Sequence, residues 1–310
     1  MTSIEVRELS KDYGTNRAVD RLSFTVRPGR VTGFLGPNGA GKSTTMRLLL
    51  GLDRPTAGAA TIGGARYECA ARPLRLAGAL LDANAAHGAR TARDHLRALA
   101  ASNRIRERRV TEVLEEAGIA SVASRRIRSF SLGMRQRLGI AAALLGDPPV
   151  LMLDEPSNGL DPEGIIWIRE LMRRLAAEGR TVLVSSHLMK ETASFADHLV
   201  VLGRGRLLAD TPMQDFIDSR IRPRVRLRST EGERLRDALL GKGFTAVERE
   251  GSVWVVEGAR VEDIGPVAAE EGITVLELAT EEATLEEAYL DLTVDQTQFR
   301  SLRVPLVPEV

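Results

Sequence analysis

The segment GPNGAGKST, residues 36–44, constrains the fold of this chain more than any other stretch. It matches the pattern G-x-x-x-x-G-K-[ST], follows the apolar run VTGFL (31–35) and opens the helical sequence KSTTMRLLLGL. Glycines let the backbone curl until successive N–H groups point at phosphate oxygens, and the helix start adds a positive dipole end. The order of strand, loop and helix therefore predicts a phosphate-binding loop in an α/β domain.

The residues of this loop have distinct expected tasks. Lys42 is expected to reach the β- and γ-phosphates of a nucleotide, and the Ser43 hydroxyl is expected to ligate Mg²⁺. The residues expected around the phosphates are Gly36, Pro37, Asn38, Gly39, Ala40, Gly41, Lys42, Ser43 and Thr44.

Strand-like and helix-like segments alternate from residue 4 to about residue 210, which favours parallel strands covered by helices. VLMLDEP (150–156) and TVLVSSH (181–187) are continuous apolar runs, typical of strands buried on both faces. The stretch between them, 163–179, has apolar residues at a helical period. Residues 92–146 interrupt the alternation and predict a helical insertion.

Three side chains at the ends of these runs are candidates for chemistry. Asp154 is expected to face the water shell of Mg²⁺, and Glu155 to polarise an attacking water. His187 ends a strand of its own, at the edge where parallel sheets bind ligands, so a γ-phosphate contact is expected.

The sequence changes character after Pro212 and predicts a second, smaller α+β domain over residues 222–293. The first domain then covers 1–215, and residues 294–310 form a tail. Near the end of the second domain, Thr284 and Glu287 have the spacing of a helix capping box. Trp254 and Tyr289 are expected in its core rather than at a ligand.

Composition narrows the possible partners. The formal net charge of +1 gives no strongly basic field, so nucleic acid is not expected as a partner. Cys69 is the only cysteine and cannot form an internal disulfide, which fits a reducing cytoplasm. No stretch reaches the roughly 18 to 20 apolar residues of a membrane span, and no apolar signal core begins the chain. Work at a membrane would need a partner.

Five segments in order carry a family resemblance: GPNGAGKST, SFSLGMRQRLGIA (129–141), LMLDEP, SNGLD (157–161) and His187. Together they resemble the ATP-binding subunit of an ABC transporter over about residues 4–215. The resemblance implies an ABC-type phosphate-loop NTPase with a helical subdomain that hydrolyses ATP with Mg²⁺. The carboxy-terminal region resembles the drug and antibiotic exporter branch of bacitracin, lantibiotic and daunorubicin type.

The resemblance also implies roles for further residues. Tyr13 stands where the family places an aromatic ring against adenine. Ser131 and Gly133 belong to the signature motif, and Asp161 to a loop at the dimer interface. Because the signature of one chain closes the ATP held by another, a pair of ATPase subunits, most simply a homodimer, is expected. The resemblance further implies a separate membrane-spanning permease and a drug-like or peptide-like cargo. It also implies a peripheral position on the cytoplasmic side of the membrane.

The sequence departs from the family pattern in its signature motif and at its switch glutamine. The usual signature Leu-Ser-Gly-Gly-Gln is here FSLGM, with Leu132 and Met134 in place of glycine and glutamine. Counting back from RTARDHL (90–96) puts Asp82 at the position of the family's switch glutamine. A carboxylate there could bind Mg²⁺ or its water, which makes Asp82 a candidate metal ligand.

Two other classes of function remain open from the sequence. One is an ATP-dependent interaction protein without a transport role, although the chain has a single phosphate loop and no sustained heptads. The other is a self-resistance protein that binds a compound through its carboxy-terminal domain, without any membrane partner.

Overall fold

The computed structural model describes residues 2–220, 223–249, 253–282, 289 and 292. The chain divides into two compact units, the first ending at Met213 and the second running from Gln214 to Leu292. The predicted tail, 294–310, and the predicted capping box at Thr284 and Glu287 lie outside the described residues.

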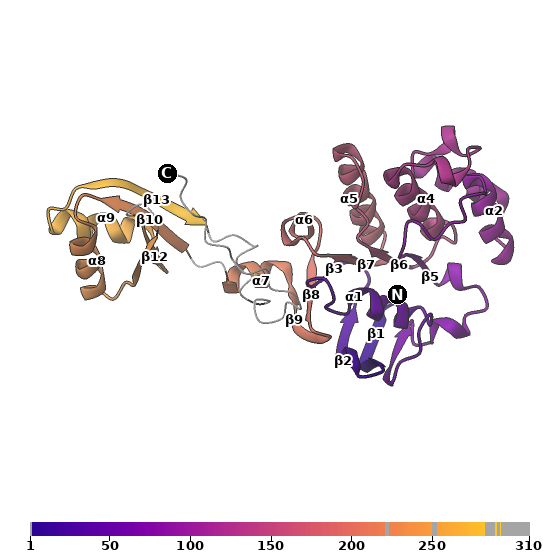
Figure 1. Cartoon of the computed structure of the whole chain (residues 1–310), viewed down its shortest axis with the longest axis horizontal. Helices are drawn as coiled ribbons and strands as arrows, with labels where there is room; N and C mark the ends of the chain where they lie inside the picture. Colours follow the sequence, from indigo (N-terminus) through magenta and orange to yellow (C-terminus); the bar gives the residue numbers. More distant parts are fainter. Residues whose placement is uncertain (1, 221–222, 250–252, 283–288, 290–291, 293–310) are drawn as a thin grey trace. The chain divides into compact units, whose positions relative to one another are not determined.

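A six-stranded sheet organises the first unit, with the strand order β5-β6-β7-β3-β8-β9 (Figure 1). Neighbouring strands are parallel except that the edge strand β9 runs antiparallel to β8. Every residue of β7 and β8 is buried, which explains their continuous apolar sequences. The strands are β3 (Arg30–Leu35), β5 (Ala77–Leu80), β6 (Val150–Asp154), β7 (Thr181–Ser186), β8 (His198–Gly203) and β9 (Arg206–Pro212).

Helices cover both faces of this sheet. Figure 1 shows α4 (Leu132–Leu144) and α5 (Pro162–Ala177) on one face and α1 (Lys42–Leu49) on the other. The helical period predicted over 163–179 is confirmed, because α5 buries Ile168, Leu171, Met172 and Leu175. Two short helices follow, α6 (Met189–Ala193) and α7 (Met213–Arg220). Among the described residues, no helix combines the length and the apolar character needed to cross a bilayer.

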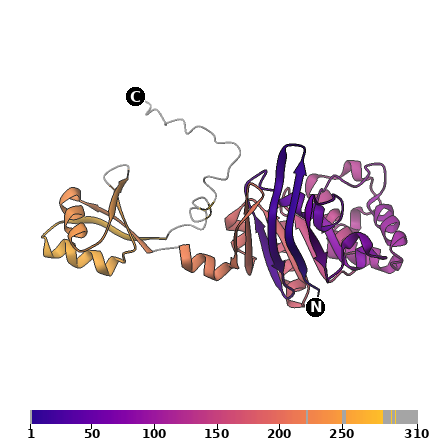
Figure 2. The same ribbon diagram turned by 90° about the horizontal axis from the view of Figure 1, so that it is seen from below.

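A second, antiparallel sheet lies on the α1 side, with the order β2-β1-β4. In Figure 2, seen from below, its indigo strands lie in front of the parallel sheet. Leu9 and Phe24 from this sheet share one core with Phe34 and Leu183 from the parallel sheet and with Met46 from α1. The alternation of strands and helices did not predict this layer. Its strands are β1 (Ile4–Tyr13), β2 (Asn16–Val26) and β4 (Ala57–Ile62).

Helices fill the segment predicted as a helical insertion. The hydroxyl of Thr91 accepts a hydrogen bond from the Asp94 backbone N–H at 3.0 Å and caps α2 (Ala92–Ser102). α3 (Glu107–Glu116) buries Val110, Val113 and Leu114 on one side, and α4 completes the group. The 3-10 turns η3 (Ala120–Val122) and η4 (Ile127–Ser129) lie within this segment, and η1 (Tyr67–Cys69) and η2 (Pro73–Arg75) precede it.

In the second unit the described residues include a four-stranded antiparallel sheet and the helices α8 and α9. The strand order is β11-β12-β10-β13. Val225 and Leu227 pack with Leu235, Leu239 and Trp254 in its core, which confirms Trp254 as a core residue. Pro266 lies inside α9 without ending it. The elements are β10 (Pro223–Ser229), α8 (Gly232–Gly241), β11 (Ala246–Arg249), β12 (Val253–Glu257), α9 (Val261–Glu270) and β13 (Val275–Glu282).

Adjacent leucines of α8 allow a matched test of this core. Leu239 is 0% exposed and Leu240 is 63% exposed. We expect Leu239→Ala to lower the free energy of unfolding of the second unit by about 2–5 kcal/mol, because it leaves a cavity. Leu240→Ala should cost less than about 0.5 kcal/mol. Urea unfolding followed by Trp254 fluorescence, in a Trp167→Phe background, measures both. Equal midpoints for the two variants would contradict this packing.

Candidate functional site

The phosphate loop lies between β3 and α1, and close backbone contacts fix its shape. Gly41 precedes α1 with a φ of 101°, a left-handed conformation that favours glycine. A Cβ atom at Gly41 would lie 2.6 Å from the carbonyl oxygen of Ala18. The N–H of Gly205 donates to the carbonyl of Ala40 at 3.0 Å from a turn on the other side. No larger residue than glycine fits at position 41.

Lys42 is buried within this loop. Its ammonium donates to the carbonyl oxygen of Gly36 at 2.5 Å and approaches that of Pro37 at 3.4 Å. Burial lowers the pKa of Lys42, while the carboxylates of Glu155 and Asp154 act in the opposite direction. A buried cation held by neutral carbonyls gains from an added anion, so phosphate oxygens are suitable partners for it.

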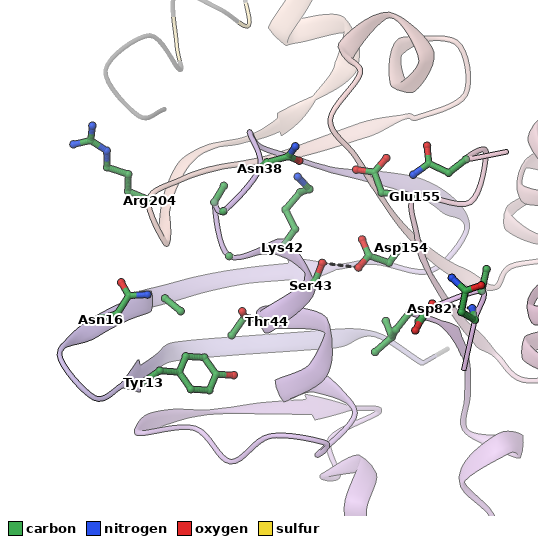
Figure 3. A pocket seen from close by; sticks show the side chains of 18 of the residues that line it. Tyr13, Asn16, Asn38, Lys42, Ser43, Thr44, Asp82, Asp154, Glu155 and Arg204 are labelled. Carbon is green, nitrogen blue, oxygen red and sulfur yellow. Dashed lines mark hydrogen bonds between the residues drawn. The ribbon is translucent and has the colours of Figure 1, made fainter. Parts of the chain in front are cut away.

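Asp154 ends β6 and is held by two serine hydroxyls. Ser43 Oγ donates to one carboxylate oxygen at 2.6 Å, drawn as the dashed line in Figure 3. Ser185 Oγ, from β7, donates to the other oxygen. The loop and the strands β6 and β7 thus bring hydroxyls and a carboxylate together from sequence positions far apart.

Glu155 follows Asp154 in an unusual backbone conformation. Its φ is 48°, a left-handed value that costs a non-glycine residue about 1–3 kcal/mol. The Glu155 N–H donates to the carbonyl of Ser185 at 3.2 Å and to its hydroxyl at 3.1 Å. His187 Nδ1 lies 2.9 Å from both carboxylate oxygens of Glu155. The surroundings therefore hold this carboxylate in one place.

An open cavity of 850 Å³ joins these groups, and Figure 3 shows the side chains that line it. Most of the predicted site residues line it: Tyr13, Asn38, Gly39, Ala40, Gly41, Lys42, Ser43, Thr44, Asp82, Asp154 and Glu155. Gly36 and Pro37 contribute the carbonyls that accept from Lys42, and His187 is bonded to Glu155. This volume accommodates a ligand of nucleotide size.

Tyr13 lies at the end of β1 with its ring at the cavity. The phenol donates to Asp53 at 2.9 Å, and the ammonium of Lys11 lies 4.8 Å from the ring centre. Burial and the Asp53 carboxylate raise the pKa of the phenol. The hydroxyl is thus anchored, and 47% of the residue is exposed. The ring is therefore a flat surface on which a base can stack.

Asp82 lies in the loop after β5 and lines the same cavity. Its carboxylate accepts from the Asn84 N–H at 2.8 Å, and Arg135 donates to the Asn84 side chain at 2.8 Å. Within the described part of the chain, no cluster of three or more His, Cys, Asp or Glu could hold a metal. Ser43 and Asp154 nevertheless fit Mg²⁺, because that ion takes one or two protein oxygens and keeps several waters.

Ser131, Gly133 and Asp161 do not belong to the described residues that line the cavity. Ser131 Oγ accepts from the Met134 N–H at 3.2 Å and caps α4. Asp161 caps α5 in the same way, by accepting from the Gly164 N–H at 2.9 Å. Both are helix starts with free N–H groups, and Leu132, between Ser131 and Gly133, does line the cavity.

Gln136 is a site residue that sequence reasoning missed. It is 3% exposed, lines the cavity, and donates from Nε2 to the carbonyl oxygen of Glu155 at 2.9 Å. Asn16, Arg17, Asn158 and Arg204 also line the cavity without having been predicted. Gln136 lies within the segment 129–141 and Asn158 within 157–161, whereas Asn16, Arg17 and Arg204 belong to no motif that a single sequence reveals.

The sequence matches known protein families and curated relatives. A family model described as "ABC transporter" matches residues 19–158, and one described as a domain of unknown function matches residues 223–286. The bacitracin transport ATP-binding protein BcrA of Bacillus licheniformis is 36% identical, over 94% of this chain and 97% of its own length. The Nod factor export ATP-binding protein I of Rhizobium etli is 38% identical, over 71% of this chain and 72% of its own length.

Solved structures agree on the fold of the first unit. The structure of an ATP-binding subunit of an ABC transporter superposes with a TM-score of 0.64 at 31% identity, covering 70% of this chain and 92% of its own. A dimeric bacterial ABC transporter cassette gives a TM-score of 0.63 at 24% identity, covering 68% of this chain and 98% of its own.

The Gln136 contact generates a kinetic prediction. Gln136→Met keeps the side-chain volume but leaves the Glu155 carbonyl without its donor. We expect kcat for ATP hydrolysis to fall about 10-fold or more, since an unsatisfied buried acceptor costs about 1–3 kcal/mol. The Kd for ATP should change less than about twofold, because the phosphate loop is untouched. If the affinity for ATP fell as much as kcat, the substitution would be disturbing the fold in general and not the Glu155 contact in particular.

Proposed function

The chain belongs to the ATP-binding subunits of ABC transporters, and we propose that it powers export of an antibiotic-like or peptide-like compound through a separate membrane-spanning permease. The observation that carries this proposal is the cavity in which a phosphate loop, Asp154 and Glu155 meet. The likeness to the bacitracin transport protein extends over almost the whole chain, second unit included, which supports export of a related class of cargo. Action on a permease implies a position on the cytoplasmic face of the membrane.

The nucleotide is held by Tyr13 at one end of the cavity and by the phosphate loop at the other. Adenine stacks on the anchored ring of Tyr13. The triphosphate lies against the N–H groups of residues 36–44 and the start of α1, where the helix dipole is positive. Lys42 exchanges its carbonyl partners for β- and γ-phosphate oxygens.

Ser43 and Asp154 are the residues that would hold Mg²⁺, with Asp82 as a third oxygen donor. The ion would neutralise negative charge on the phosphate groups. The hydrogen bond between Ser43 and Asp154 already brings both oxygens together.

Hydrolysis is assigned to the carboxylate of Glu155. It takes a proton from a water molecule, the water oxygen attacks the γ-phosphorus, and the bond to the β–γ bridging oxygen breaks to give ADP and phosphate. His187 Nδ1 holds Glu155, which leaves Nε2 to contact the γ-phosphate. Lys42 stabilises the charge that develops on the phosphoryl oxygens.

The site is complete only when a second copy of the chain contributes to it. Ser131 caps α4, and neither Ser131 nor Gly133 lines the cavity beside its own phosphate loop, which supports a contact with the nucleotide of a second copy. A head-to-tail homodimer lets each α4 close the ATP of the other copy, with Asp161 at the interface. Leu132 and Met134 replace glycine and glutamine, and the N–H groups of Leu132 and Gly133 at the helix start remain for this contact.

Removal of the Glu155 charge tests the hydrolysis step. We expect Glu155→Gln to lower the rate of ATP hydrolysis at least about 100-fold, because the general base is lost. ATP should then hold the variant as a dimer that light scattering after size exclusion detects, whereas Lys42→Ala should stay monomeric. Wild-type turnover by Glu155→Gln would remove the assigned role of this carboxylate.

Neutralising Asp82 tests its place in the metal site. Asp82→Asn keeps the oxygen that accepts from Asn84 but removes the charge. We expect the Mg²⁺ concentration for half-maximal ATPase to rise roughly fivefold, since a unit charge near the ion is lost. An unchanged Mg²⁺ dependence in Asp82→Asn would restrict the metal site to Ser43 and Asp154.

A further inference from the structure

Five arginines gather on two neighbouring segments, one at the beginning of the helical insertion and one inside it. They are Arg90 and Arg93, at the start of α2, and Arg125, Arg126 and Arg128, around η4. We call this set the arginine surface. All are exposed except Arg93, which is half-buried.

Backbone hydrogen bonds hold the two segments side by side. The Arg93 N–H donates to the carbonyl of Ala123 at 3.0 Å, and the Ile127 N–H donates to the carbonyl of Arg90 at 2.9 Å. An antiparallel bridge pairs Thr91 with Arg126. The arginine surface is therefore built by the fold and not by one run of basic sequence.

The charges of the arginine surface are not neutralised within the described part of the chain. No acidic side chain there forms an ion pair with any of the five. Asp94, the nearest acid in the sequence, is bonded to Thr91 and lies 3.7 Å from Arg97. Burial lowers the pKa of His95, and the positive charge of Arg90 lowers it further. In a chain of net charge +1, this is a local excess of positive charge.

The chemistry of the arginine surface selects among possible occupants. A protein partner needs apolar or aromatic anchors at the centre of its interface, and single-stranded nucleic acid needs aromatic rings for stacking. None of the exposed large apolar side chains of the described residues lies in segments 88–93 or 123–128. An anionic lipid surface needs only clustered cations, and four to eight of them suffice.

We propose that the arginine surface binds the anionic phospholipid headgroups of a bilayer. This goes beyond the proposed function, because the partner is lipid and the permease takes no part in it. The attraction acts over about 8 Å at physiological ionic strength, so it orients the chain on the membrane before any permease contact forms.

Vesicle co-sedimentation of the full chain tests this inference. Wild-type protein should bind vesicles of phosphatidylcholine mixed with phosphatidylglycerol far better than phosphatidylcholine alone, and added NaCl should release it. The triple variant Arg125→Glu, Arg126→Glu, Arg128→Glu should bind roughly 100-fold more weakly, since each arginine contributes about fivefold at such a surface.

A matched control carries the same change of net charge elsewhere. Arg27, Arg54 and Arg228 are exposed and form no side-chain ion pair or hydrogen bond within the described residues, so their triple change to glutamate should leave vesicle binding near wild type. The ATPase activity of both variants in detergent-free buffer should match that of the wild type. This activity verifies folding and is measured independently of vesicle binding. Equal binding to both kinds of vesicle, equal loss in both variants, or salt-sensitive binding to RNA in place of lipid would overturn the proposal.

Discussion

The close approach of three backbone segments at Gly41 supports everything else in the site. The phosphate loop lies against Ala18 of β2, and Gly205, in the turn between β8 and β9, also approaches the Ala18 carbonyl. A Cβ at Gly205 would lie 2.7 Å from that oxygen, nearly the same distance as one at Gly41. Because no side chain fits between these segments, both sheets fix the loop, and Lys42 and Ser43 enter α1 at defined positions.

Helix α4 carries both a capped helix start and a side chain that is bonded to Glu155. Its first residue is capped by Ser131, and one turn later Gln136 holds the backbone of Glu155. A contact at the start of α4 is therefore about one helical turn from Gln136, which is bonded to Glu155, the proposed general base of the same chain. In a dimer, closure of one nucleotide by α4 would bear directly on the geometry of the other hydrolysis centre.

Local patterns in the sequence predicted the features of the fold that depend on residues close together in the chain. The phosphate loop, the buried strands and the period of α5 each follow from residue types within a few positions. The β2-β1-β4 sheet, the anchoring of Tyr13 by Asp53 and the bond from Gln136 to Glu155 could not be predicted in this way. They depend on which distant segments pack together, and a single sequence carries no local signal for that. The arginine surface arises likewise, because η4 and the start of α2 meet only in the fold.

Mixing two inactive variants tests most directly whether each hydrolysis centre is shared between copies. Lys42→Ala removes a phosphate-loop function, and Ser131→Arg blocks the start of α4. A mixed dimer has one intact centre, built from the loop of one copy and the α4 of the other, so an equimolar mixture should recover about a quarter of wild-type ATPase activity. If the mixture stays as inactive as its components, or if Ser131→Arg alone retains full turnover, hydrolysis does not require a centre shared between two copies.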